Sequence, residues 1–134
     1  MNKLIVMVGL PKAGKSTWAR KSGYPIVSRD AVGHAFNRLT AYEAFAPENH
    51  KMLLEYVRLM ACSLFNAGHE TVVLDWTNII EGDRNLWKHK DWTVEFKVVP
   101  TSLAVCLSRT EEERAKTEIK RLYAICDVPE IKGE

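Results

Sequence analysis

The chain has 134 residues, of which 46% are hydrophobic, and its formal net charge is +2. We expect this length to form one domain over residues 1–134, and the composition excludes a disordered chain. The nearly balanced charge gives no argument for nucleic-acid binding, so a nucleic-acid substrate requires a local patch. Since no apolar run approaches the roughly 18 residues that cross a bilayer, we expect a cytoplasmic protein with no membrane partner. The cysteines Cys62, Cys106 and Cys126 lie far apart without metal-ligand spacing, which predicts reduced thiols.

The first half of the chain predicts two strands and three helices. Residues 4–8 form a continuous apolar run, which is typical of a strand buried on both faces of a parallel sheet. A helix over residues 15–21 is followed by a short strand over 26–28, and Asp30 can cap a helix that runs toward residue 39. Pro47 opens the longest helix, whose apolar residues recur at three- and four-residue steps and predict core packing. Gly68 is expected to end this helix.

The second half continues the alternation of strands and helices. Residues 71–74 predict a strand that ends at Asp75, and a helix over 82–89 leads to a strand over 93–99. Two closing helices are expected over 103–108 and 114–125. The alternation predicts an α/β fold with a small parallel sheet flanked by helices on both faces. Ligands of such sheets bind beyond the carboxyl ends of the strands, so we expect one cleft built from residues 9–16, 28–30, 75–78 and 100–102.

Residues 9–16 match the phosphate-binding loop pattern G-x-x-x-x-G-K-[ST] at every fixed position. The glycines let backbone N–H groups turn inward around the phosphates, and the following helix offers its positive N-terminal end. Lys15 is expected to reach the β- and γ-phosphates, and the Ser16 hydroxyl to bind magnesium. We therefore predict a nucleoside triphosphate site, with ATP and magnesium as cofactors, formed by Gly9, Pro11, Lys12, Ala13, Gly14, Lys15, Ser16 and Thr17.

The residues after the other strands favour a kinase over two other classes of P-loop protein. Hydrolytic motors place a glutamate directly after the aspartate of the neighbouring strand, but Asp75 is followed by Trp76 and Thr77. The Asn-Lys-x-Asp motif with which switch GTPases read guanine is absent from the sequence. A kinase needs a carboxylate that takes a proton from the acceptor hydroxyl, and Asp30, just past the second strand, is in the right place for this role. The alternative is that Asp30 is only the N-cap of the helix that follows. Asp75 either binds magnesium through a water or anchors Thr77 and Asn78.

Arg109 and Arg114 lie on either side of three glutamates, in a segment near residues 108–115. A kinase must neutralise the charge of the transferring group and exclude water, and a mobile lid with arginines meets both needs. The same pattern is also typical of a solvated helix face.

Three segments resemble the bacteriophage-type polynucleotide 5′-kinase and its P-loop relatives: residues 14–20, 28–30 and 75–78. The resemblance spans nearly the whole chain and implies a P-loop NTPase fold of the nucleoside- and polynucleotide-kinase type. It implies that Lys15 and Ser16 bind phosphates and magnesium, with Asp30 as the general base. It also implies that Asp75, Thr77 and Asn78 support the site, and that Arg109 and Arg114 are lid arginines over the donor nucleotide, Arg109 acting in catalysis with Lys15 and Asp30.

The acceptor site departs from this family in one place. The family tends to have an arginine three residues after the catalytic aspartate, where it grips a phosphate of the acceptor, and this position is Gly33. Arg29, His34 and Arg38 are the candidates for acceptor binding. We expect an ATP- and magnesium-dependent kinase that acts on a nucleic-acid hydroxyl, with a polynucleotide 5′-OH as the first candidate acceptor. The alternatives are a kinase acting on a hydroxymethylated DNA base, a nucleoside or a small metabolite, and an ATP-binding module without catalysis.

Overall fold

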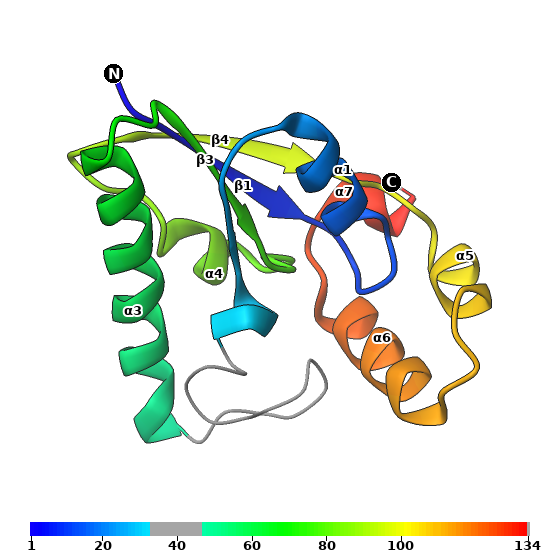
Figure 1. The fold of residues 1–134 in the computed structure, drawn as a ribbon. Coiled ribbons are helices and arrows are strands. Elements are labelled where there is room, and N and C mark those ends of the chain that lie inside the picture. The colour runs from blue at the N-terminus through cyan, green and yellow to red at the C-terminus, as the bar shows by residue number, and fades with distance from the viewer. Residues whose placement is uncertain (33–46, 134) are drawn as a thin grey trace.

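A four-stranded parallel sheet forms the centre of the molecule (Figure 1). The computed structural model describes residues 1–32 and 47–133, so His34, Arg38 and most of the helix expected to run toward residue 39 lie outside the described residues. The strand order is β2-β3-β1-β4, and every pair is parallel. The strands are β1 (Lys3–Val8), β2 (Ile26–Ser28), β3 (Thr71–Asp75) and β4 (Thr93–Val98).

One face of the sheet carries the larger part of the core. Successive side chains of a strand point to opposite faces, so Leu4 and Val6 of β1 share one face. They pack in one cluster with Val57, Ala61 and Phe65 of the longest helix, α3 (Pro47–Asn66). The three helical residues are four apart, which gives α3 the apolar stripe that the sequence predicts.

The opposite face is covered by α1 (Lys15–Ser22), which follows the phosphate-binding loop. Ile5 and Met7 of β1 pack there with Ala19 of α1. Helices therefore cover both faces, and the predicted architecture is confirmed. Within the described residues, no helix is long and apolar enough to cross a membrane. The three cysteines are free, with Cys106 and Cys126 buried and Cys62 partly exposed.

Three helices pack at the carboxyl end of β1: α5 (Leu103–Ser108), α6 (Glu113–Ile125) and α7 (Pro129–Lys132). Their cluster contains Leu10, Cys106, Ile119 and Ile131, all buried. The sequence did not predict α7, because four residues are too few to show a helical period. Its proline at the first turn was the available signal. This cluster holds α5 and α6 against the end of β1 where the phosphate-binding loop begins.

The helix expected over residues 82–89 is shorter in the structure, where α4 spans Glu81–Asn85. Beyond Asn85 the amides of Leu86, Trp87 and Lys88 donate to carbonyls three residues earlier instead of four, so the α-helical pattern is not continued. Two carbonyls of this segment accept hydrogen bonds from side chains. Leu86 accepts from Arg58 Nη2 at 2.6 Å, and Trp87 accepts from Trp92 Nε1 at 2.8 Å. Trp87 and Trp92 are both buried in the main core, so tertiary packing of the two indoles overrides the local helical pattern.

Candidate active site

The phosphate-binding loop joins β1 to α1, and glycine is favoured at two of its positions. Gly14 has a φ of 109°, which L side chains rarely adopt. A Cβ on Gly9 would lie 3.1 Å from the Val99 carbonyl oxygen, a tight contact that glycine avoids. The loop is fixed from the neighbouring segment, because the Thr101 hydroxyl donates to the Ala13 carbonyl at 2.7 Å. The loop is therefore positioned by its backbone geometry and by contacts with the segment that follows β4.

Lys15 lies at the start of α1 with its side chain folded back along the loop. Its Nζ donates to the Leu10 carbonyl at 2.7 Å, and the residue is only 8% exposed. Burial lowers the pKa of Lys15 to about 8, while the negative charges of Asp75 and Asp30 act in the opposite direction. A buried cation that donates to a neutral carbonyl favours an anionic ligand, because an anion would compensate its lost hydration.

Ser16 and Asp75 meet beside the loop. The Ser16 hydroxyl donates to Asp75 Oδ2 at 2.6 Å, which joins the first turn of α1 to the end of β3. Magnesium in nucleotide sites binds one or two protein oxygens, the phosphates and several waters. Within the described ranges, no group of three His, Cys, Asp or Glu side chains could hold a metal by itself. The pair therefore fits a magnesium ion shared with a nucleotide, the role predicted for both residues.

Asp30 lies at the carboxyl end of β2, with its side chain 56% exposed. It does not cap the helix that follows. The helix begins at Arg29, and the Ser28 hydroxyl accepts from the Ala31 amide at 3.2 Å. The N-cap alternative for Asp30 is therefore wrong, because Ser28 fills that place. The carboxylate instead lies 3.6 Å from Arg29 Nη1.

One cleft of about 1250 Å³ joins these groups. Residues from all four strand ends line it, as the fold predicts. Among the predicted site residues, the lining includes Pro11, Lys12, Ala13, Gly14, Lys15, Ser16, Thr17, Arg29, Asp30, Asp75, Thr77 and Arg109.

The sequence matches, over residues 4–125, the model of a family described as an AAA domain. The chain belongs to this AAA domain family. No curated protein matches it.

Solved structures with the same fold include several kinases. A chain of the Pnkp1/Rnl/Hen1 complex matches with a TM-score of 0.68 at 22% identity, over 84% of this chain and 40% of that chain. Shikimate kinase from Acinetobacter baumannii, in complex with shikimate, matches with a TM-score of 0.59 at 17% identity, over 99% of this chain and 80% of that chain. A sugar kinase from Janibacter sp. HTCC2649 matches with a TM-score of 0.65 at 14% identity, over 96% and 79% of the two chains. The chain spans about two fifths of the Pnkp1 complex chain. The family and these structures confirm the P-loop NTPase fold.

Three predicted site residues of this AAA domain do not line the cleft. Gly9, the first residue of the loop, is buried. Asn78 is 1% exposed and has a structural position, since its Nδ2 donates to the Met7 carbonyl and its Oδ1 accepts from Trp87 Nε1. Arg114 is exposed on α6, outside the cleft lining. Arg109, in contrast, lines the cleft, and its Nη1 donates to the Lys12 carbonyl at 2.8 Å.

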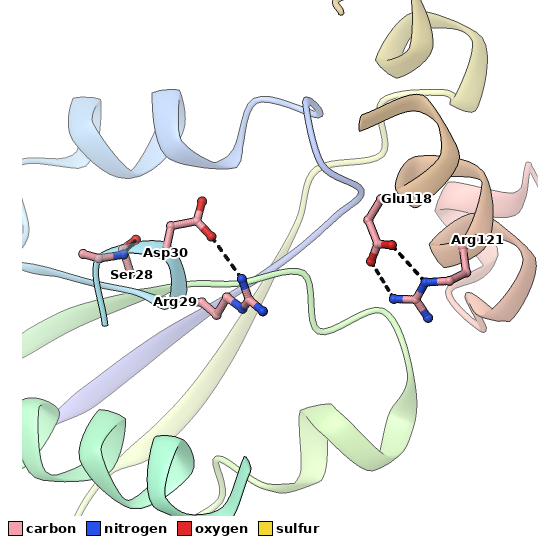
Figure 2. A network of polar contacts seen from close by, with 6 residues as sticks. Ser28, Arg29, Asp30, Glu118 and Arg121 are labelled. Atoms are coloured by element: carbon pink, nitrogen blue, oxygen red, sulfur yellow. Dashed lines mark hydrogen bonds and ion pairs between the residues drawn. The ribbon is translucent and has the colours of Figure 1, made fainter. Parts of the chain in front are cut away.

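Helix α6 provides a wall of the cleft that the sequence did not predict. Glu118, Arg121, Leu122 and Ile125 all line the cleft, and their spacing of three, four and seven residues marks one face of a helix. That spacing was visible in the sequence. It did not single out these residues because Arg29, which Glu118 faces across the cleft, comes just after β2, about ninety positions earlier (Figure 2).

Proposed function

We propose that this AAA domain is an ATP- and magnesium-dependent kinase that transfers the γ-phosphate to a hydroxyl group of nucleic acid, most directly a polynucleotide 5′-OH. One observation carries the proposal. A buried lysine in a phosphate-binding loop and a carboxylate at the next strand end, Lys15 and Asp30, line the same cleft. A kinase needs this arrangement, since the donor phosphate and the acceptor hydroxyl must meet between them.

The donor would bind along the loop and the start of α1. Backbone N–H groups and Lys15 would hold the β- and γ-phosphates, and Arg109 already reaches the loop at Lys12. Ser16 and Asp75 would hold magnesium, Asp75 through a water. Magnesium, when bound, neutralises negative charge on the phosphates. The missing glutamate after Asp75 supports transfer to an acceptor rather than to water.

Asp30 would act as the general base. The acceptor hydroxyl oxygen attacks the γ-phosphorus, the bond from this phosphorus to the β–γ bridging oxygen breaks, and ADP leaves. The hydroxyl proton passes to the Asp30 carboxylate, which is 56% exposed and therefore accessible to an acceptor. Arg29 Nη1 lies 3.6 Å from this carboxylate.

The proposal is tested by incubating the protein with γ-labelled ATP, magnesium and a 5′-hydroxyl oligonucleotide. We expect label on the oligonucleotide end, and turnover at least about a hundredfold lower for Asp30→Asn with ATP affinity within a few-fold. Asp91→Asn is the matched control, because Asp91 is exposed beside His89 and does not line the cleft. Equal turnover of Asp30→Asn and wild type would remove Asp30 from its role. If no label appears on the oligonucleotide, a polynucleotide 5′-OH is not the acceptor.

A second candidate keeps the chemistry and changes the acceptor to a hydroxymethylated base, a nucleoside or a small metabolite. It is favoured by the balance of charge beside Asp30. Arg29 and Arg121 line the cleft there, but so do Asp30 and Glu118. An acceptor affinity that does not depend on salt would support this candidate, since phosphate contacts of a nucleic acid release counterions. A chain that binds ATP and labels no acceptor of either class would instead be a non-catalytic binding module.

A further inference from the structure

Strand β4 forms one edge of the sheet, and no strand of the described chain pairs with its outer side (Figure 1). On its inner side, the amide of Thr93 donates to the Asn2 carbonyl beside β1. Successive residues of a strand direct their backbone groups to opposite edges, so Val94, Phe96 and Val98 direct their N–H and C=O groups outward. The outer side of β4 is therefore a row of backbone donors and acceptors that another strand can join.

The side chains of β4 alternate between charged and apolar. Glu95 and Lys97 are exposed on the face of the sheet that carries α1, and Phe96 is 39% exposed on the other face. Glu95 lies 3.1 Å from Lys3 in a pair that is exposed on both sides, and such pairs hold weakly. The ammonium of Lys97 lies 5.6 Å from the centre of the Trp18 ring. Both charges thus remain accessible to a partner from another chain.

Charges on an edge strand commonly prevent pairing with other strands, but here they do so selectively. When β4 pairs antiparallel with a second copy of itself, outward-directed residues must face outward-directed residues, so the register can shift only in steps that keep this match. A register centred on Glu95 brings the two Glu95 carboxylates together, and one centred on Lys97 brings two ammonium groups together. Like charges directly opposite one another are destabilising.

The register centred on Phe96 is complementary instead. Each Glu95 then faces Lys97 of the other copy at a position where side chains approach closely, because these residues exchange no backbone hydrogen bonds. The two Phe96 residues face one another, exchange backbone hydrogen bonds and cover their exposed rings. Charge, backbone direction and apolar surface therefore favour the same register.

We propose that two copies of this chain form a two-fold symmetric dimer through antiparallel pairing of β4 with β4, centred on Phe96. The two sheets then become one continuous sheet. Because the paired strands run in opposite directions, the clefts at their carboxyl ends lie toward opposite ends of the shared strand pair. The interface does not depend on which reaction the cleft performs.

Sedimentation equilibrium of the full chain tests the dimer. A single pair of short strands buries little area, so we expect a weak complex whose average mass rises from 15.3 kDa toward twice that value between about 10 µM and 1 mM. A wild type that stays at 15.3 kDa over this whole range overturns the proposal.

Two charge reversals test the register. Glu95→Lys places lysines opposite Lys97, and Lys97→Glu places glutamates opposite Glu95, so each variant alone should self-associate at least about tenfold more weakly. An equimolar mixture of the two variants restores opposite charges at both positions and should form a heterodimer at least as readily as the wild type dimerises. Wild-type self-association of either variant, or a mixture that stays monomeric, overturns the proposed register.

Phe96→Pro tests the backbone pairing at the centre. Its N–H points away from β1, so proline removes a bond of the dimer without removing one from the sheet of a single copy, and we expect a monomer. Glu55→Lys is the matched control, because it makes the same charge change at an exposed position of α3 and should associate as the wild type does. Unchanged thermal melting shows that the variants are folded. A Phe96→Pro variant that dimerises like the wild type would show that β4 is not the interface.

Discussion

Ser16 and Asp75 are 59 residues apart in the sequence, and their side chains share a hydrogen bond of 2.6 Å beside the phosphate-binding loop. The bond joins α1 to β3, the strand that pairs directly with β1. Two oxygen groups from separate elements are thereby held at the distance from which both can act on one small cation, either directly or through its waters.

Asp75→Asn tests this relationship. The amide can still accept from Ser16 but carries no charge, so we expect the magnesium concentration for half-maximal activity to rise about tenfold or more. Thermal stability should change little, because the hydrogen bond lies at the surface. A magnesium titration of labelled-phosphate transfer gives the result. An unchanged titration curve would show that Asp75 only positions Ser16.

Lys15→Met should make the folded protein more stable. Burial lowers the pKa of Lys15 from 10.5 to about 8, so folding is penalised at neutral pH by a buried charge. We expect a gain on the order of 1–3 kcal/mol at pH 7, measured by urea denaturation, together with loss of ATP binding. Lys120→Met, at an exposed position, should show neither effect.

The same lysine makes the stability of the wild type depend on pH in one direction. Between about pH 8 and 10.5 the unfolded chain holds a proton on Lys15 that the folded chain has released. The Lys15 contribution to the free energy of unfolding therefore rises through this window and is constant below it. The difference between wild type and Lys15→Met should shrink as the pH increases. A difference that stays constant would show that Lys15 is not buried as a cation.

Asn78→Ala should destabilise the protein by about 2–4 kcal/mol, since it leaves two buried groups without a partner. These are the Met7 carbonyl and Trp87 Nε1, which Asn78 joins at 2.9 and 2.8 Å. The backbone φ of 47° at this position adds strain for alanine. Asn85→Ala, on the exposed side of α4, is the control and should change the urea midpoint little.

Arg109→Ala and Arg114→Ala should differ in their effect on the donor nucleotide. Arg109 contacts the loop carbonyl of Lys12 and lines the cleft, so its loss should raise the KM for ATP about tenfold. Arg114 is exposed outside the lining, and its substitution should change the KM less than twofold. Equal effects of both substitutions would instead indicate that α6 moves over the nucleotide, as the lid hypothesis requires.

The local parts of the site were predictable from sequence because their chemistry is set by neighbours along the chain. The phosphate-binding loop, its glycines and the position of Lys15 follow from one contiguous pattern between a strand and a helix. The convergence of Asp30 and Asp75 on this loop follows from the parallel sheet, whose carboxyl ends share one edge.

The remaining features depend on contacts between distant segments. Asn78 looked like a cleft residue, but Trp87 and Met7 draw it into the core. The position of the segment after α4 depends on Arg58, which donates to the Leu86 carbonyl, and the α6 wall of the cleft depends on which face of α6 turns toward Arg29. Neither is visible in a local period, because the partners are tens of residues away.

Lys15 and Arg109 both donate to carbonyl oxygens of the phosphate-binding loop, at Leu10 and Lys12. These two loop carbonyls therefore compete with a triphosphate for the same two cations. When a nucleotide binds, its phosphate oxygens replace these carbonyls as the partners of Lys15 and Arg109. The binding enthalpy therefore contains the difference between the two sets of charge-assisted hydrogen bonds. The exchange needs only short side-chain movements, because both cations already lie at the loop before the ligand arrives.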